Sequence, residues 1–240
     1  DEELARLLKR NYGKKVQEVF KEITDEQLEL TDEIREININ FKEHFYRVQL
    51  KKVNTDNIFS NSGILQIENQ EYMAAIYLLD ETRLRRLERE NIDQKLVVGL
   101  IYVDNYEEVL QSVEDVRASL LAALIDRKIN KFISGLDGIV RKLEKDKYFI
   151  IFKRQALDAV RSDKFSIIDD IKTVSIGNEL QVTVSIGIGV GAETYSQLSD
   201  YSRAAMDLAL GRGGDQAVVK DGENIYYYGG KTKQVEKNTR

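Results

Sequence analysis

The sequence contains no cysteine and no proline, and His44 is its one histidine. Without cysteine, the chain cannot form disulfide bonds, thiolate metal sites or a cysteine nucleophile. With one histidine, it cannot build a catalytic or metal site that needs two imidazole rings. No apolar run approaches the roughly 20 residues that a membrane-spanning helix needs, and no secretory signal is visible. Enzymes built on cysteine or on paired histidines are therefore excluded.

The net charge of the chain argues against one class of partner, nucleic acid. Lysine and arginine number 36 against 41 aspartates and glutamates, which gives a formal net charge of −5. Surfaces that bind nucleic acid normally carry a basic excess on one face, so no nucleic-acid partner is expected. Apolar residues make up 42% of the 240 residues, enough for one large or two small folded domains. Because the chain begins with Asp1 rather than methionine, we expect it to be part of a longer protein.

The first 79 residues predict a small α+β unit. Apolar residues recur at helical spacing from Leu4 to Leu8 and again from Val16 to Ile23. Alternating or continuous apolar runs then predict antiparallel strands at residues 36–40, 45–50, 63–68 and 73–79. The segment 54–62 is rich in turn-forming residues and predicts an exposed loop.

Residues 80–95 have a different composition. Leu84 and Leu87 form a thin apolar stripe in an otherwise highly charged segment, which predicts a connecting helix. Such a stripe is typical of a helix that pairs with a second copy of itself, and this alternative predicts a homodimer. The stripe suits equally an amphipathic linker that lies on one domain.

From residue 96 onward the pattern indicates an α/β sandwich. The expected elements are a buried strand at 96–103, a helix at 109–124, strands at 138–143 and 148–153, one or two helices within 155–174, a strand at 180–190, a helix at 195–210, and a hairpin at 217–219 and 225–228. The order β-α-β-β-α-β-α-β is typical of a palm-like sandwich of the ferredoxin-derived type.

Four motifs in this second part carry a resemblance to a known family. They are Leu100-Ile101-Tyr102-Val103-Asp104, Lys145-Asp146-Lys147-Tyr148, Val184-Ser185-Ile186-Gly187-Ile188-Gly189 and Leu210-Gly211-Arg212-Gly213-Gly214-Asp215. Residues 97–230 thereby resemble the GGDEF domain, the diguanylate-cyclase fold, in the degenerate form found in the GdpP (YybT) family of cyclic-di-AMP phosphodiesterases. The fourth motif is the most specific of them.

The front of the chain resembles a PAS sensor. Gly13 to Phe20 is similar to the PAS helix before the last strands, and Leu78 to Thr82 resembles the signal at which PAS domains end. The resemblance implies a PAS-like sensor at 1–79 whose first strands lie before Asp1, a signalling helix at 80–95 and a degenerate GGDEF domain at 96–240. Sensors of this family can bind haem, which makes His44 a candidate axial ligand; a surface histidine is the alternative.

The resemblance also implies modules outside this sequence. In the family, two membrane helices precede the sensor, and a DHH-type phosphoesterase module with a manganese site follows the cyclase-like domain. The motifs of that module do not occur here. We therefore expect a regulatory segment at the cytoplasmic face of a bacterial membrane, with membrane helices, manganese and phosphodiesterase catalysis all supplied by other parts of the parent protein.

An active cyclase of this fold holds Mg²⁺ between two carboxylates beside the substrate phosphates. The resemblance places Tyr102 at the first of these positions and Asp146 at the second. A phenol is a poor Mg²⁺ ligand, because its pKa of about 10 keeps it protonated. Asp104, on the same strand face as Tyr102, is the candidate replacement. The alternative for Asp104 is a turn or helix-capping role.

The predicted site is thus a degenerate nucleotide-binding pocket. Asp104 and Asp146 would hold one Mg²⁺, and Lys147 or Lys142 would meet the triphosphate of ATP or another nucleotide. A solvated turn lysine is the alternative for Lys147. Members of the family have feeble ATP hydrolysis in this domain, and the resemblance implies the same here.

Other positions argue against a working cyclase or a P-loop. Glu144 and Lys145 replace the two glycines of the cyclase hairpin and would crowd and repel the substrate, so cyclase activity is not expected. The segment 211–215 leaves a helix and lacks a following Gly-Lys-Ser/Thr, so we predict a helix end with Gly211 or Gly213 at positive φ. Three functions stay open: a regulatory nucleotide-binding segment, an active cyclase or ATPase, and a dimerisation scaffold that binds nothing.

Overall fold

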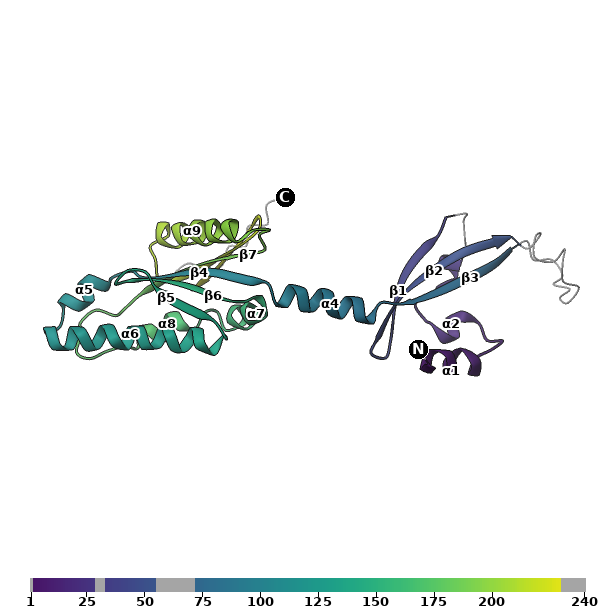
Figure 1. Ribbon diagram of the computed structural model, residues 1–240, viewed down its shortest axis with the longest axis horizontal. Coiled ribbons are helices and arrows are strands. Elements are labelled where there is room, and N and C mark those ends of the chain that lie inside the picture. The colour runs from purple at the N-terminus through teal and green to yellow at the C-terminus, as the bar shows by residue number, and fades with distance from the viewer. Residues whose placement is uncertain (1, 29–32, 55–71, 230–240) are drawn as a thin grey trace, which may run out of the picture. The chain divides into compact units, whose positions relative to one another are not determined.

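The computed structural model describes residues 2–28, 33–54 and 72–229 (Figure 1). The chain divides into two compact units, Asp1–Glu90 and Asn91–Arg240. The boundary falls within helix α4 (Thr82–Asp93), which occupies the segment predicted to connect two domains. The predicted strand at 63–68, and the predicted loop from residue 55 on, lie outside the described residues. In the described part, no helix is both long and apolar enough to cross a membrane.

The first unit packs short helices on one face of a three-stranded antiparallel sheet. Its elements are α1 (Glu2–Arg10), α2 (Val16–Val19), α3 (Asp25–Leu28), β1 (Arg35–Phe41), β2 (His44–Asn54) and β3 (Tyr72–Asp80), with strand order β1-β2-β3. The period of two in the sequence turns Ile39, Val48 and Leu50 inward, where they meet Leu4 and Phe20 from the helical segments. The α+β prediction is confirmed for this unit, whereas its resemblance to a PAS sensor stays a prediction.

The second unit is an α/β sandwich around a six-stranded sheet. Its elements are β4 (Leu96–Val103), α5 (Tyr106–Gln111), α6 (Asp115–Gly135), β5 (Ile139–Lys142), β6 (Lys147–Lys153), α7 (Arg154–Ser162), α8 (Ile167–Lys172), β7 (Val184–Val190), α9 (Tyr195–Gly211), β8 (Gln216–Asp221) and β9 (Asn224–Gly229). The strand order is β5-β6-β4-β7-β8-β9, in which β7 and β8 run parallel. The predicted fold class is confirmed.

Two predicted boundaries were wrong. The single helix expected at 109–124 is two helices, and the second, α6, continues to Gly135 because Leu121, Ile125 and Ile129 repeat at four-residue spacing on its buried side. The strand expected from residue 180 begins at Val184. The segment before it is held by the Asn105 amide, which donates to the Gln181 carbonyl (2.7 Å) and accepts from the Thr183 amide (3.1 Å).

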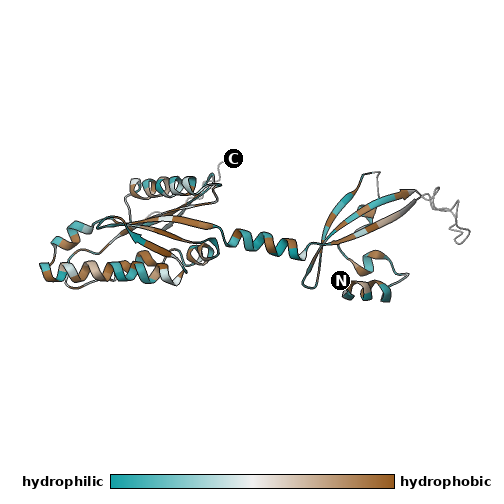
Figure 2. Cartoon of the chain, in the orientation of Figure 1, coloured by the Kyte–Doolittle hydropathy of each residue, from teal (hydrophilic) through white to brown (hydrophobic). Residues whose placement is uncertain are grey.

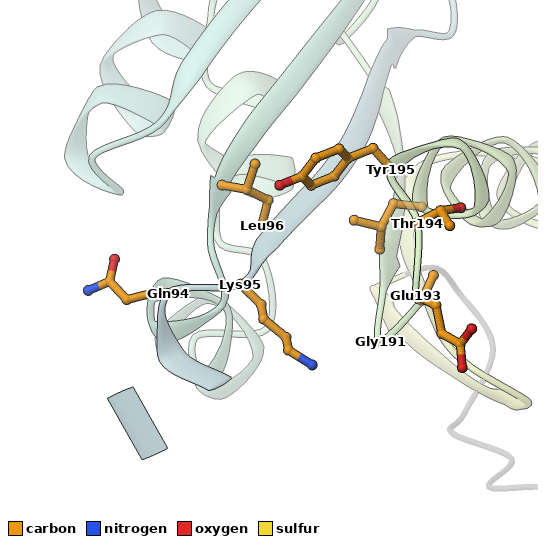
Figure 3. Close-up of a pocket in the computed structure, with 9 residues that line it drawn as sticks. Gln94, Lys95, Leu96, Gly191, Glu193, Thr194 and Tyr195 are labelled. Atoms are coloured by element: carbon orange, nitrogen blue, oxygen red, sulfur yellow. The ribbon is translucent and has the colours of Figure 1, made fainter. Parts of the chain in front are cut away.

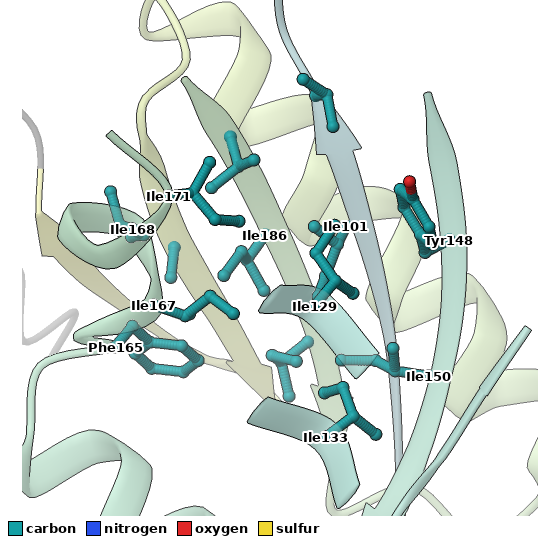
Figure 4. Packing of buried hydrophobic residues seen from close by; sticks show 14 of the residues in the cluster. Ile101, Ile129, Ile133, Tyr148, Ile150, Phe165, Ile167, Ile168, Ile171 and Ile186 are labelled. Carbon is teal, nitrogen blue, oxygen red and sulfur yellow. The ribbon is translucent and has the colours of Figure 1, made fainter. Parts of the chain in front are cut away.

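The main core lies between the sheet and helices α6, α7 and α8 (Figures 1 and 4). Inward-facing residues of the central strands β4 and β7 meet the isoleucines of α6 and α8 there, and Figure 4 shows Ile101 and Ile186 beside Ile129. In the hydropathy colouring of Figure 2, β4 is largely hydrophobic, as expected for a strand buried on both faces. The continuous apolar run at 96–103 therefore follows from coverage of both faces of the sheet.

Helix α9 covers the opposite face, and two glycines of β7 let it approach (Figure 1). A Cβ atom added to Gly187 would lie 2.5 Å from the Met206 amide nitrogen, and one added to Gly189 would lie 2.2 Å from the Leu198 carbonyl oxygen. Only glycine fits at such a distance from another backbone. The two glycines of the Val184–Gly189 motif thus serve helix packing.

Candidate functional site

Tyr102 lies near the end of β4, at the position that the sequence resemblance assigned to a metal ligand of active cyclases. It pairs with Lys147 of β6 on one side and with Ser185 of β7 on the other, so all three residues belong to the α9 face of the sheet. The Lys147 ammonium lies 5.5 Å from the centre of the Tyr102 ring. The position thus holds an aromatic ring under a cation, an arrangement with an attractive cation–π contact and no metal ligand.

Asp104 follows directly after β4, and its carboxylate faces the loop after α9. One of its oxygens accepts a hydrogen bond from the Asp215 backbone amide at 3.0 Å. A Cβ atom added to Gly214 would lie 2.9 Å from the same oxygen and 3.2 Å from the Ser185 hydroxyl, so the three groups adjoin. The cap of α5 is Asn105, which excludes the helix-capping role for Asp104. Asp104 ties the end of β4 to the glycine loop.

Partial burial raises the pKa of Asp104, and the neighbouring carboxylate of Asp215 adds to this. The hydroxyl of Ser185 and the amide of Asp215 oppose the effect by favouring the charged carboxylate. Lys172 balances Asp215 through a 2.7 Å ion pair. The Ser185 hydroxyl and one Asp215 carboxylate oxygen are buried without a well-formed hydrogen bond. Two polar oxygens beside the end of β4 are therefore available for a further hydrogen bond.

Asp146 occupies the turn that leads into β6. Its backbone carbonyl accepts from the Val103 amide at 2.9 Å, and its charge acts on the neighbouring Lys147 and Tyr148. The carboxylate that raises the pKa of Asp104, beyond the effect of burial, is that of Asp215 and not that of Asp146. Among the residues described, no group of three or more acidic or histidine side chains is placed to hold a metal ion. The two aspartates therefore form no ready-made Mg²⁺ site, and a bound nucleotide would have to supply phosphate oxygens as further ligands.

Lys142 lies on the other face of the sheet from Lys147. Its ammonium is 2.9 Å from the Asp126 carboxylate of α6 and 5.3 Å from the centre of the Tyr148 ring. The Tyr148 hydroxyl also donates to Asp126, and burial followed by this hydrogen bond raises the pKa of Tyr148 well above its ordinary value. The structure thus places the two alternative candidates for the triphosphate on opposite faces of the sheet. Lys142 belongs to the network that joins the hairpin to α6.

The hairpin tip carries two further ion pairs. Lys147 pairs with Glu144 at 2.8 Å, and Lys145 pairs with Glu107 of α5 at 3.7 Å. Both pairs lie at the surface, where a salt bridge contributes about 0–1 kcal/mol. Displacing Glu144 or Glu107 by a phosphate group would therefore cost little free energy.

Sequence reasoning missed the part played by Ser185, Asp215 and Lys172. The signal for Asp215 was its place directly after two glycines at positive φ, Gly213 (+100°) and Gly214 (+75°), which bring the loop close to β4. Gly213 donates to the Leu210 carbonyl and so ends α9, as predicted. Lys172 gave no local signal, because it reaches the cluster from α8.

His44 begins β2 and turns towards the start of α4. Its Nδ1 atom is 3.5 Å from the Asp80 carboxylate and 3.4 Å from the Thr82 hydroxyl. The Thr82 hydroxyl and amide both donate to Asp80, and these two hydrogen bonds lower the pKa of Asp80. This ring nitrogen thus belongs to the turn before α4. Haem ligation by His44 stays an untested prediction.

A separate cavity of about 520 Å³ lies at the other end of β4 (Figure 3). It is lined by Gln94, Lys95, Leu96, Gly191, Ala192, Glu193, Thr194, Tyr195 and Leu198. In Figure 3 the Tyr195 ring extends from the start of α9 towards Leu96. None of the site residues predicted from the sequence lines this cavity.

Comparisons with known proteins agree with the motifs. Residues 101–226 match the family model described as the GGDEF domain of cyclic-di-AMP phosphodiesterase GdpP-like proteins. The chain is 31% identical over 194 residues to the cyclic-di-AMP phosphodiesterase GdpP of Geobacillus thermodenitrificans, covering 80% of this chain and 30% of that protein. It is 34% identical over 166 residues to the cyclic-di-AMP phosphodiesterase PdeA of Listeria monocytogenes, covering 69% of this chain and 25% of that protein.

The chain thus spans less than a third of the length of these relatives. Among solved structures, the GGDEF domain of DgcB from Caulobacter crescentus is similar at 13% identity and a TM-score of 0.45, covering 58% of this chain and 88% of that chain. The family match covers more than half of the 240 residues. The chain belongs to the family of GGDEF domains of cyclic-di-AMP phosphodiesterase GdpP-like proteins.

Proposed function

We propose that this chain is a regulatory segment that binds a nucleoside triphosphate with Mg²⁺ at the end of β4, and that it regulates a cyclic-di-AMP phosphodiesterase module of its parent protein. That module, and the helices that hold the parent at the cytoplasmic face of the membrane, are placed outside this sequence. The regulatory part of the proposal rests on family membership. The nucleotide part rests on the side chains at the end of β4.

The observation that carries the nucleotide site is a convergence on one face of the sheet. Lys147 and Tyr102 are directly paired, and Asp104 follows two residues later on the same strand end. A phosphate would meet the Lys147 ammonium after displacing Glu144 from an exposed ion pair. Asp104 would accept Mg²⁺ that arrives with the phosphates, because Mg²⁺ commonly uses one or two protein carboxylates together with phosphate oxygens.

The same geometry argues against nucleotide cyclisation. Tyr102 supplies a phenol in place of a carboxylate ligand. Glu144 and Lys145 fill the hairpin positions at which the backbone would have to approach the substrate. Cyclisation needs the metal, the attacking ribose hydroxyl and the α-phosphate in a fixed arrangement. These side chains support the binding of one nucleotide, with at most slow hydrolysis.

Calorimetric titration with Mg-ATP tests the proposal on the parent chain and on Asp104→Asn, Asp146→Asn and the double variant. Each asparagine removes the charge and keeps the shape, so the loop bond from Asp215 to position 104 can persist. Each single change should weaken binding by roughly 1–3 kcal/mol, the cost of losing a charge-assisted partner. The double variant should lose less than the sum, because both carboxylates act through one ion.

The outcomes separate three functions. Binding of Mg-ATP by the parent and loss in the variants supports the nucleotide site. Equal titrations for all four proteins, or no binding at all, would make the domain a scaffold instead. Rapid release of phosphate or of a cyclic product from bound nucleotide would show an enzyme in its own right.

A further inference from the structure

The α9 face of the sheet in the second unit is covered along only part of its width. Helix α9 packs mainly on β7, β8 and β4, and the outer strands β6 and β5 lie beyond it. Directly paired residues share a face of the sheet. Two rows on this face run outward from α9: Gly189–Val98–Ile151–Ile139 and Gly187–Leu100–Phe149–Arg141.

Burial falls along both rows with distance from the helix. Val98 is 4% exposed beside α9, Ile151 and Phe149 on β6 are half-buried, and Ile139 on β5 is 70% exposed. Leu143, which follows β5, is 54% exposed. Single exposed apolar residues are normal on a protein surface, whereas contiguous ones mark an interaction site. We refer to the outward face of Ile139–Leu143 and Lys147–Lys153 as the β5–β6 strip.

The strip has the width of one helix. Neighbouring strands lie about 4.8 Å apart, so β5 and β6 together span about 10 Å, which is close to the diameter of an α-helix with its side chains. Helix α9 lies beside the strip on the same face. A second helix laid on β5 and β6 would complete this layer, as α6, α7 and α8 do on the opposite face (Figure 1).

The charged side chains on the strip are all cations. Lys147 and Lys153 stand at the two ends of β6 and are paired at the rim with Glu144 at 2.8 Å and Asp137 at 3.5 Å. Arg141 lies between them on β5. A positive centre with neutralised ends favours a partner that brings one carboxylate to the middle of the strip.

Arg141 is the distinctive residue of the strip. It lies between Ile139 on β5 and Leu143 just after it, opposite Phe149, and its guanidinium forms no ion pair with any residue that the structure describes. A guanidinium binds a carboxylate through two parallel hydrogen bonds. An arginine amid apolar side chains is typical of the residues that dominate the affinity of an interface.

From this arrangement we propose that the β5–β6 strip binds an amphipathic helix of a partner protein, and that this helix sets a carboxylate from its apolar side against Arg141. A second copy of this chain is a poorer occupant, because a symmetric contact centred on the strip would bring two Arg141 guanidiniums together. A flat lipid surface is also poorer, because α9 rises about 10 Å beside the strip and keeps a plane away from it.

A set of synthetic peptides tests the proposal on the full chain. The probe is a helical peptide with a leucine stripe and one glutamate within the stripe, and its matched control has glutamine at that position. Fluorescence anisotropy should show binding of the glutamate peptide and about tenfold weaker binding of the glutamine peptide. Arg141→Glu should abolish binding of the glutamate peptide and allow binding of a third peptide with lysine at the same position. Arg203→Glu, on α9, is the control variant and should bind as the parent does.

Other results would overturn the proposal. Equal affinity for the three peptides, or no binding of any, would remove the carboxylate-bearing helix as the occupant. A dimer in sedimentation that Arg141→Glu or Ile139→Asp dissociates would assign the strip to a second copy of the chain. Binding to anionic but not zwitterionic vesicles, lost in Arg141→Glu, would assign the strip to lipid. Circular dichroism of each variant checks that the fold is retained.

Discussion

Helix α9 rests on the sheet through two glycines, and substituting Gly189 should break this contact. An alanine Cβ at position 189 would lie 2.2 Å from the Leu198 carbonyl oxygen and 2.7 Å from the Ser202 amide nitrogen. Both atoms belong to the α9 backbone, so no side-chain rotation can relieve the clash. The helix must shift outward, and overpacking of this kind costs roughly 1–3 kcal/mol. Gly189→Ala should therefore lower the unfolding free energy of the second unit by about that amount.

Gly211, the last residue of α9, provides the control. No atom lies within 4 Å of a Cβ added there, and its φ is not positive. Gly211→Ala should raise stability by about 0.5–1 kcal/mol, because alanine favours the helix more than glycine does. Urea denaturation followed by circular dichroism measures both variants. Equal midpoints for Gly189→Ala and the parent would show that α9 does not lie directly on β7.

Three further predictions concern the site and the connecting helix. Burial raises the pKa of Asp104 above 3.8 in the folded state, so the ionised carboxylate lowers the stability of the fold. Asp104→Asn should therefore be more stable than the parent in urea denaturation at neutral pH. This difference in stability should shrink as the pH falls through the raised pKa towards 3.8. Chromatography after incubation with GTP and Mg²⁺ should show no cyclic-di-GMP, since Tyr102 replaces a metal ligand; a clear product peak would refute this. Leu84 and Leu87 are about half exposed on α4, so Leu84→Glu with Leu87→Glu should convert a dimer into a monomer in sedimentation; a parent that is monomeric at tens of micromolar would contradict the dimer.

The fold could be predicted from the sequence wherever one periodicity dominated. The strand at 96–103 was predicted to the residue, because a strand buried on both faces is apolar throughout. The start of β7 was predicted four residues early, because the alternating pattern continues through residues 180–183, where the side chain of Asn105 takes up the hydrogen bonds. A side chain distant in sequence leaves no mark on local periodicity.

The candidate site was harder to predict for the same reason. The motif placed Asp104 and Lys147 on neighbouring strands, and they do lie at the same end of β4. Lys142 was predicted as the alternative to Lys147 for the triphosphate, yet strand alternation sends it to the α6 face, where Asp126 binds it. The roles of these residues stay predictions.

The contribution of Lys147 to nucleotide binding tests the central claim most directly. Lys147 and Lys153 lie on the same strand and the same face, at opposite ends of β6, and each is paired with one surface acid. Calorimetric titration with Mg-ATP should show that Lys147→Met binds about tenfold more weakly than the parent, the effect of losing one hydrogen bond to a charged group. Lys153→Met should bind as the parent does. Equal affinities for the parent and both variants, or equal losses in both, would contradict a nucleotide site at the end of β4.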